Sequence, residues 1–283
     1  MTQLFIHKKD VHSQHGEDGV ISEIFNLIGT QNKWCVELGA LDGVHHSNSR
    51  QLILSGWSAV LIEADPTYFE KLAATYNGVE RVYGLNEFVS FEGRQSLDAL
   101  LARTPIPQTF DLLSLDIDGN EYHVWEALSN YRPRVVAIEF NFTIPNDIVF
   151  IQPRDMSVQQ GSSLSALVEL AHHKGYKLAA VTLGNAFFVD EEDFGKLGIE
   201  EPAPDEVNPD TKYYTRLFQL YDGTIVLNGY QRLLWHNIPM DVSKMQLVPK
   251  KYVAGISANP FVRRIKYVVR KLPFYSWVQK MRK

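Results

Sequence analysis

Short apolar runs alternate with segments of helical periodicity over most of the first 190 residues. The runs predict strands and the segments predict amphipathic helices between them. The predicted strands are Cys35–Leu38, Ser58–Glu63, Glu80–Leu85, Phe110–Asp116, Arg134–Asn141 and Tyr176–Leu183. The predicted helices are Gly19–Ile28, Ser49–Ser55, Pro66–Tyr76, Gln95–Arg103, Tyr122–Asn130 and Leu164–Lys174. Strand–helix units of this length imply right-handed crossovers, so the pattern indicates an α/β fold with a mostly parallel sheet flanked by helices.

Three other segments complete the predicted domain. Residues 11–33 form an N-terminal helical lead-in, whose polar start is either a capped helix entry or a wall over a ligand. Residues 188–210 are acidic and contain prolines, which predicts a solvated loop. Residues 211–227 read as strands around an Asp-Gly turn, a hairpin signal. We therefore assign residues 1–240 to one domain and residues 241–283 to a tail.

Composition places the chain among folded globular proteins. Of its 283 residues, 45% are apolar and 22% are charged. Its single cysteine, Cys35, excludes an internal disulfide and, in an apolar strand, is expected to be a core residue rather than a nucleophile. The chain lacks an apolar run long enough to span a membrane, and its start lacks the apolar region of a secretory signal. These features predict a cytoplasmic location.

Charge is distributed unevenly between the domain and the tail. Residues 1–241 carry 17 basic and 33 acidic side chains, whereas no acidic residue follows Asp241. The basic residues of the tail are Lys244, Lys250, Lys251, Arg263, Arg264, Lys266, Arg270, Lys271, Lys280, Arg282 and Lys283. Apolar residues recur at helical spacing from Asn259-Pro260 to Leu272, opposite basic ones.

Such a basic amphipathic helix within residues 259–283 suits the surface of an anionic membrane or glycolipid, so we expect peripheral contact with the inner face of the membrane. The alternative is a helix that packs on the domain or on a partner subunit. Nucleic acid is not an expected partner, because the acidic domain would repel phosphates.

The ends of the first two strands carry the candidate cofactor chemistry. Glu37 ends the first strand before the glycine turn Gly39–Gly43, and Glu63 ends the second. Ligands of open α/β sheets bind beyond the carboxyl ends of strands, and an acid after the second strand suits the hydroxyls of a ribose. The Gly-x-Gly-x-x-Gly and Gly-x-x-x-x-Gly-Lys phosphate motifs are absent from the sequence. An acid at Glu37 suits an amine better than a phosphate, so the combination favours S-adenosylmethionine over NAD.

The next strand ends offer candidate groups for the reaction itself. Asp116 and Asp118 leave one strand, and Glu139 and Asn141 leave the following one. The ends of parallel strands are neighbours, so these four side chains are candidate ligands of Mg²⁺ or another divalent cation that lowers the pKa of an acceptor hydroxyl. Without a metal, Asp118 or one of His45, His46 and His123 is the candidate general base.

Several motifs together resemble the FkbM-type family of S-adenosylmethionine-dependent methyltransferases. They are Ser13-Gln-His-Gly-Glu-Asp18, Val36-Glu-Leu-Gly-Ala-Leu-Asp-Gly43, Ser47-Asn-Ser49, Gly56-Trp57 with Leu61-Ile-Glu-Ala-Asp-Pro66, and Leu115-Asp-Ile-Asp-Gly-Asn-Glu121. The resemblance is good over residues 11–145 and loose elsewhere. This chain departs from it with Glu37 and Ala40-Leu41, where many members show Asp and Ala-Asn.

The resemblance implies a class I methyltransferase sheet, Rossmann-like, and O-methylation of sugar hydroxyls in natural products, capsules or lipopolysaccharides. By position, Glu37, Gly39 and Gly43 would line the methionine end, Glu63 the ribose, and Ala64 and Asp65 the adenine edge. Asn86 or Glu87 would neighbour the adenine. Gln14, Ser47 and Asp116 stand in the matching motifs and join the expected cofactor site. The expected acceptor is a carbohydrate or a glycolipid.

Two other classes of function stay open at this point. One is a non-catalytic binding or trafficking module that keeps the methyltransferase fold. The other is a nucleotide-sugar or NAD-dependent enzyme, which the missing phosphate loop disfavours.

Overall fold

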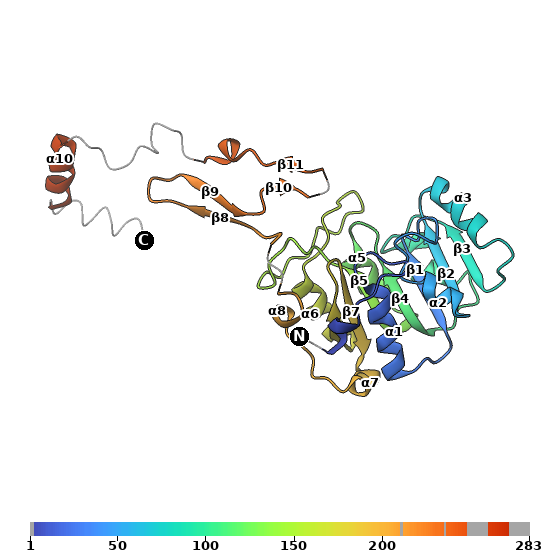
Figure 1. Ribbon diagram of the computed structural model, residues 1–283. Coiled ribbons are helices and arrows are strands. Elements are labelled where there is room, and N and C mark those ends of the chain that lie inside the picture. The colour runs from blue at the N-terminus through green and yellow to red at the C-terminus, as the bar shows by residue number, and fades with distance from the viewer. Residues whose placement is uncertain (1–2, 210–211, 235, 248–259, 272–283) are drawn as a thin grey trace. The chain divides into compact units, whose positions relative to one another are not determined.

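The computed structural model describes residues 3–209, 212–234, 236–247 and 260–271 (Figure 1). The chain forms two compact units, Met1–Thr211 and Lys212–Lys283. The sequence placed the boundary after residue 240, whereas the division in the structure comes before the hairpin that the sequence assigned to the first domain.

The first unit is built on one seven-stranded sheet. Its strands are β1 (Trp34–Leu38), β2 (Ser58–Glu63), β3 (Val82–Asn86), β4 (Thr109–Leu115), β5 (Arg132–Glu139), β6 (Tyr176–Val181) and β7 (Asn185–Asp190). They lie in the order β3-β2-β1-β4-β5-β7-β6, and β7 alone runs antiparallel to its two neighbours. The predicted mostly parallel sheet is therefore confirmed.

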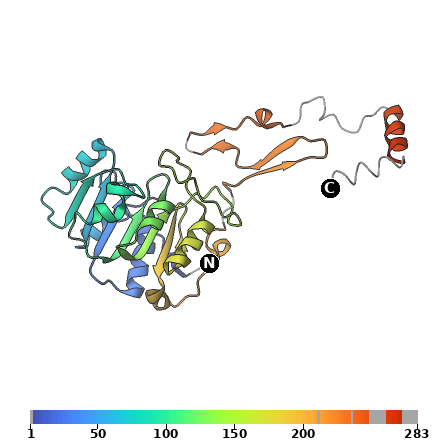
Figure 2. The ribbon, with the colours of Figure 1, turned by 180° about the vertical axis from the view of Figure 1, so that it is seen from behind.

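Helices cover both faces of this sheet (Figures 1 and 2). The main ones are α1 (Glu17–Ile28), α2 (Arg50–Leu54), α3 (Pro66–Thr75), α4 (Leu97–Leu101), α5 (Glu121–Ala127) and α6 (Leu164–Lys174). Side chains of α1, α2 and α3 pack in one core cluster, and side chains of α4, α5 and α6 pack in the other. The unit is therefore a three-layer sandwich of helices, sheet and helices.

The apolar strand runs supply both cores because successive side chains of a strand point to opposite faces. Cys35 packs with α1 and α2, whereas its neighbour Val36 and then Leu38 pack against the other helical layer. Leu112 and Leu113 divide in the same way. Cys35 is fully buried, and burial raises the pKa of its thiol well above the usual value, as befits the expected core residue.

The chain reverses its direction of travel across the sheet between β1 and β4. From β1 it proceeds outward through β2 to β3, and it then returns to β4 on the other side of β1. Such a switch point opens a crevice beyond the carboxyl ends of the two strands, where ligands of α/β sheets bind. The strand order thus places the site before any side chain is considered.

The segment predicted as a solvated loop over residues 188–210 is largely ordered, so this prediction is wrong. Strand β7 runs to Asp190 and is buried throughout, and α7 (Glu191–Phe194) follows it, then a 3₁₀ turn (Gly195–Leu197) and α8 (Pro204–Val207). Acidic residues in this segment have structural roles that the prediction did not consider. Asp190, for example, accepts a 2.6 Å hydrogen bond from Arg132 and caps α7.

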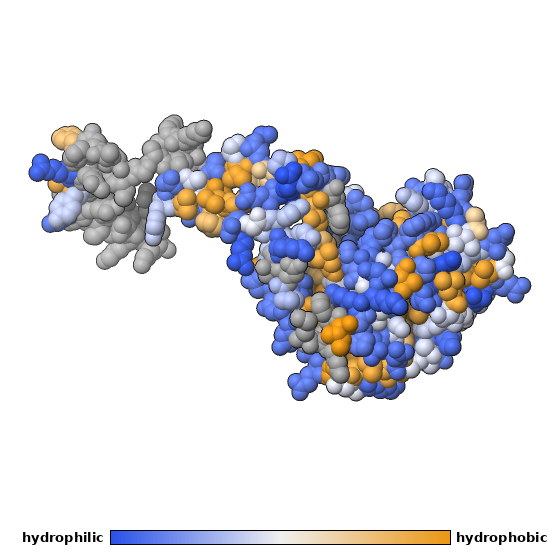
Figure 3. All heavy atoms as spheres, in the orientation of Figure 1, coloured by the Kyte–Doolittle hydropathy of each residue, from blue (hydrophilic) through white to orange (hydrophobic). Residues whose placement is uncertain are grey.

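The second unit contains the predicted hairpin and short elements after it. Strands β8 (Thr215–Gln219) and β9 (Ile225–Gly229) pair antiparallel around the Asp-Gly turn, which confirms the hairpin. The short elements are β10 (Arg232–Leu233), β11 (Ile238–Pro239) and a 3₁₀ turn (Val242–Met245). Apolar side chains gather on the surface of the hairpin, among them Leu217 and Phe218 (Figure 3).

A helix, α10 (Pro260–Lys271), occupies the start of the predicted amphipathic tail. The predicted continuation over residues 272–283 lies outside the described residues, so the full basic amphipathic tail stays a prediction. Among the residues that the structure describes, no helix combines the length and the apolar character needed to cross a membrane.

Candidate active site

Glycine at position 39 allows the ends of β1 and β4 to meet. Gly39 has φ of 70°, a left-handed conformation, and a Cβ there would collide with the carbonyl oxygen of Asp116. Gly43, at the other end of the turn, has φ of 74°, and a Cβ would press on the ring of Tyr76. Both glycines of the sequence motif are therefore required by the backbone.

Glu63 ties this glycine turn to the end of β2. One of its carboxylate oxygens accepts a 2.8 Å hydrogen bond from the Leu41 amide, and the other accepts a 2.7 Å bond from the Asp65 amide. The side chain is buried, but each carboxylate oxygen can accept a second hydrogen bond. Glu63 thus holds the turn and keeps acceptor positions, and its contact with a ribose stays a prediction.

Glu37 is engaged more completely than the sequence suggested. Its buried carboxylate accepts hydrogen bonds of 2.7 Å from Ser47 Oγ, 2.6 Å from the Asn48 amide and 2.5 Å from Ser49 Oγ. Burial raises the pKa of Glu37, while these bonds act against the rise. Glu37 and Ser47, both predicted to contact the cofactor, therefore bond to each other, and their direct contact with it stays a prediction.

The residues expected at the adenine edge lie at the ends of β2 and β3. Asp65 caps α3 by accepting from the Thr67 and Tyr68 amides, which lowers its pKa. Asn86 donates 2.8 Å and 3.2 Å hydrogen bonds to the carbonyl oxygens of Glu63 and Ala64 and so joins the two strand ends. Ala64, Asp65 and Asn86 are exposed and accessible to a ligand.

The N-terminal motif forms a loop that its own hydrogen bonds hold together. The Asp18 carboxylate accepts from the amides of Val11, His12 and Ser13, and Glu17 accepts a 2.7 Å bond from the His15 amide. The predicted cofactor residue Gln14 is exposed on this loop.

Glu17 is a further candidate site residue, which the sequence prediction did not include. It is 1% exposed, its Oε1 atom has no hydrogen-bond partner, and its charge contributes to raising the pKa of Asp116. The only sequence feature that could have indicated Glu17 is its position in the Ser13–Asp18 motif, and that motif by itself predicts a capped helix start.

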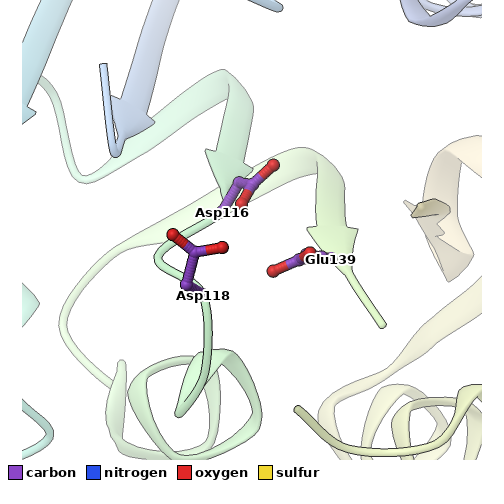
Figure 4. Close-up of side chains that lie close together, drawn as sticks. All are labelled: Asp116, Asp118 and Glu139. Carbon is purple, nitrogen blue, oxygen red and sulfur yellow. The ribbon is translucent and has the colours of Figure 1, made fainter. Parts of the chain in front are cut away.

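Three carboxylates converge beyond β4 and β5 (Figure 4). Asp116, Asp118 and Glu139 each offer one oxygen atom within 4.8 Å of the others. Strand β4 ends at Leu115, so Asp116 and Asp118 do not share a face by strand alternation. Instead Asp118 has φ of 57°, and the turn that this creates returns its side chain toward Asp116. The sequence predicted this convergence, but not the backbone that produces it.

The carboxylates of this edge raise one another's pKa. Burial, followed by the charge of Asp118, raises the pKa of Asp116 to about 6. Burial and then Asp116 raise the pKa of Glu139. Burial also raises the pKa of Glu121 to about 7, although its Oε1 accepts a 2.6 Å hydrogen bond from the Gly119 amide. The edge is therefore a concentration of negative charge that protons or a cationic ligand would relieve.

Asn141 and His123 are engaged by contacts of their own, and His45 and His46 are exposed. Asn141 Oδ1 accepts from the Thr143 amide (3.0 Å) and hydroxyl (2.6 Å), and its amide group donates to the Gln160 carbonyl. His45 is exposed, with Nδ1 2.6 Å from Asp42 Oδ2, and His46 is exposed at φ of 59°. His123 is buried with Nε2 2.9 Å from the Gln152 carbonyl oxygen.

The order of the strands agrees with the fold that the sequence motifs predicted. A sheet in the order β3-β2-β1-β4-β5-β7-β6 with an antiparallel β7 has the class I methyltransferase fold. The model of the methyltransferase FkbM domain matches residues 94–178. This match, which spans less than a third of the chain, includes the Leu115–Glu121 motif and confirms the resemblance to that family.

The chain is similar in structure to several solved proteins at low sequence identity. One is magnesium protoporphyrin IX methyltransferase from Synechocystis PCC 6803 with bound SAH, at 10% identity, with 62% of this chain and 81% of that one covered and a TM-score of 0.40. A putative methylase from Haemophilus influenzae is 17% identical over 62% and 98% of the two chains, with a TM-score of 0.38. A TehB-like SAM-dependent methyltransferase from Corynebacterium glutamicum is 12% identical over 66% and 92%, with a TM-score of 0.39. No curated protein matches the sequence.

Proposed function

We propose that this protein transfers a methyl group from S-adenosylmethionine to a hydroxyl of a carbohydrate, on a glycan or a glycolipid. The observation that carries the proposal is the meeting of Gly39 with Asp116 at the switch point of the sheet, beside a set of carboxylates. The match of residues 94–178 to the FkbM methyltransferase domain supports the same activity.

The residues at this edge fit S-adenosylmethionine. The cofactor carries an ammonium and a sulfonium, and the edge offers Glu17, whose buried Oε1 has no partner, together with Asp116. The turn Gly39–Gly43 follows β1 at the switch point of the sheet, where ligands of such sheets bind, and Glu63 has acceptor positions for ribose hydroxyls. Ala64, Asp65 and Asn86 would line the adenine. When bound, the cofactor supplies a methyl group activated for transfer to a nucleophile.

The acceptor hydroxyl must lose its proton as it attacks the methyl group. Asp118 is exposed and lies beside the half-buried Asp116, so an acceptor arriving from solvent meets these carboxylates first. A carboxylate there can accept the proton, and carboxylates also accept hydrogen bonds from the other hydroxyls of a sugar. We assign Asp116 and Asp118 to this step, while His45 and His46 stay candidate bases.

We also propose that the second unit brings the enzyme to an anionic membrane surface. Lys212–Lys283 carries fourteen Lys and Arg against the two acids Asp222 and Asp241. Within α10, Ile265, Val268 and Val269 are exposed apolar side chains alongside Arg264 and Lys271. Apolar side chains and basic charge together favour an interface with anionic lipid, where a glycolipid acceptor resides.

Calorimetric titration of the full chain with S-adenosylmethionine and S-adenosylhomocysteine tests the first proposal. We expect one site per chain. Mass spectrometry then follows methyl transfer to sugars and to lipid-linked oligosaccharides, and a gain of one methyl group on a hydroxyl is the expected product. If neither cofactor form binds, the enzyme proposal fails and the non-catalytic binding module becomes the better explanation. Binding of NAD or of a nucleotide sugar instead would favour a nucleotide-sugar or NAD-dependent enzyme.

A further inference from the structure

The carboxylates beyond β4 and β5 have the composition of a site for a hard cation. Asp116, Asp118 and Glu139 offer three oxygen atoms within 4.8 Å of one another (Figure 4). Two oxygens on one ion lie at most two metal–oxygen distances apart, which is ~4 Å for Mg²⁺ and ~5 Å for Ca²⁺. The spacing therefore admits a single ion with little movement of the exposed Asp118.

Two buried oxygen atoms beside the cluster lack a hydrogen-bond partner. Glu17 Oε1 is one, in a residue that is 1% exposed and whose charge acts on Asp116. Asn185 Oδ1 is the other, in a residue that is 6% exposed. Asn185 is paired with Glu139 across β5 and β7, and side chains of directly paired residues lie on the same face of a sheet.

Unpartnered buried oxygens are rare because each forgoes the hydrogen bonds that water would give it. Here they belong to residues next to three carboxylates that offer oxygen atoms within 4.8 Å of one another. A bound cation accounts for both features, since it supplies positive charge and binds oxygen atoms. The cluster contains neither thiolate nor imidazole, which favours Mg²⁺, Mn²⁺ or Ca²⁺ over Zn²⁺.

We propose that Asp116, Asp118 and Glu139 bind one hard divalent cation, with the amide oxygen of Asn185 as a further ligand. Asn185 replaces Asn141, the fourth ligand that the sequence suggested, because Asn141 Oδ1 is bonded to Thr143. Glu121 is not a ligand in this proposal, because its Oε1 holds the amides of Ile117 and Gly119. Glu17 is not a ligand in this proposal, but its charge acts on Asp116, so the cation also offsets the charge of Glu17.

The cation would act on the acceptor through the exposed side of the site. Asp118 is the exposed ligand, so solvent or an acceptor hydroxyl can reach the ion from its side. With the ion bound, Asp116 and Asp118 would act on the acceptor through the ion rather than as free bases. A hydroxyl bound to a divalent cation has a lowered pKa and gives up its proton more readily. This role rests on the proposed methyl transfer, whereas binding of the ion does not.

Electron paramagnetic resonance of Mn²⁺ tests the site without cofactor or acceptor. The full chain, first treated with EDTA, is titrated with Mn²⁺, and loss of the free-ion signal reports binding. We expect one Mn²⁺ per chain, displaced by Mg²⁺ or Ca²⁺, and the competing ion that displaces it at lower concentration identifies the preferred one. Failure to bind Mn²⁺ at millimolar concentration would overturn the proposal.

Variants locate the ion. Asp118→Asn and Glu139→Gln should weaken Mn²⁺ binding at least about tenfold, as loss of metal-site groups does. Asn185→Ala should weaken it less, whereas Glu80→Gln, an exposed acid of the same unit, should leave it unchanged. Circular dichroism checks that each variant is folded. Asp118→Asn is the decisive variant, because Asp118 is exposed and its substitution should leave the fold intact. Unchanged Mn²⁺ binding in Asp118→Asn would contradict the proposed site. Metal binding with no binding of S-adenosylmethionine would leave the site standing and remove the proposed function.

Discussion

The carbonyl oxygen of Asp116 occupies the position that a side chain at residue 39 would take. Gly39 follows β1 and Asp116 follows β4, so this contact joins the two strands at the switch point of the sheet. The glycine turn and the acid cluster, which are far apart in the sequence, are thereby parts of one site.

Gly39→Ala should disable the site. The new methyl group must push β1 and β4 apart, and a shift of about 1 Å in a site can cost ~100-fold in rate. We expect kcat/KM for methyl transfer to fall by about that factor, with weaker cofactor binding by calorimetry. Gly195→Ala is the matched control, because Gly195 has φ of −58° and open space around its Cβ position. Equal activity of the two variants would show that the contact is irrelevant to the site.

Glu37→Ala should destabilise the fold around the Ser47–Ser49 segment. It leaves the Ser47 and Ser49 hydroxyls and the Asn48 amide without their acceptor in a buried place. One buried unpaired group costs ~1–3 kcal/mol, so the free energy of unfolding in urea should fall by at least about 2 kcal/mol. Ser47→Ala, which removes one of the three donors, should cost about 1 kcal/mol. A smaller loss in Glu37→Ala than in Ser47→Ala would contradict the structural role assigned to Glu37.

Asp42 makes a contribution to stability that depends on pH. Burial alone would raise its pKa, but hydrogen bonds from the His45 amide and ring and from the Val44 amide lower it to about 2. Because the folded-state pKa lies below the unfolded value of ~3.9, the contribution is present above about pH 4 and is lost as the pH falls toward 2. Asp42→Asn should therefore lower the urea midpoint at pH 6 and approach the parent protein near pH 2.5. A gap that stays constant over this range would exclude the ionised Asp42 as its source.

Truncation after residue 259 should release the protein from anionic vesicles. We expect the full chain to sediment with vesicles that contain phosphatidylglycerol but not with vesicles of pure phosphatidylcholine. The reason is that basic charge supplies much of the attraction to the membrane. Arg264→Gln combined with Lys271→Gln should weaken binding ~30-fold, from about 1 kcal/mol per charge. Affinity for S-adenosylmethionine should be unchanged in both variants. If the full chain does not bind the anionic vesicles, the membrane proposal is withdrawn.

The sequence by itself determined the class of the sheet and the edge at which its site lies. Apolar runs such as Ser58–Glu63 alternate with amphipathic segments. The spacing of apolar residues within each segment is a local property, so it can be recognised in the sequence alone. The acids at Glu37, Glu63 and Asp116 could be placed at one edge for the same reason, because parallel strands all end on one side.

The tertiary structure decided what each of those side chains does. Glu37 was expected to face a ligand, yet it is bonded to Ser47, Asn48 and Ser49, because the loop folds back onto the end of β1. The acid-rich segment that begins at the end of β7 was predicted to be a solvated loop because its charges suggest exposure. The sequence does not show that Asp190 pairs with Arg132. Asn185 and Glu17 became candidates for the site only through pairing across β5 and β7 and through the effect of the Glu17 charge on Asp116. Such contacts join residues distant in sequence, and neither period nor composition encodes which of them will meet.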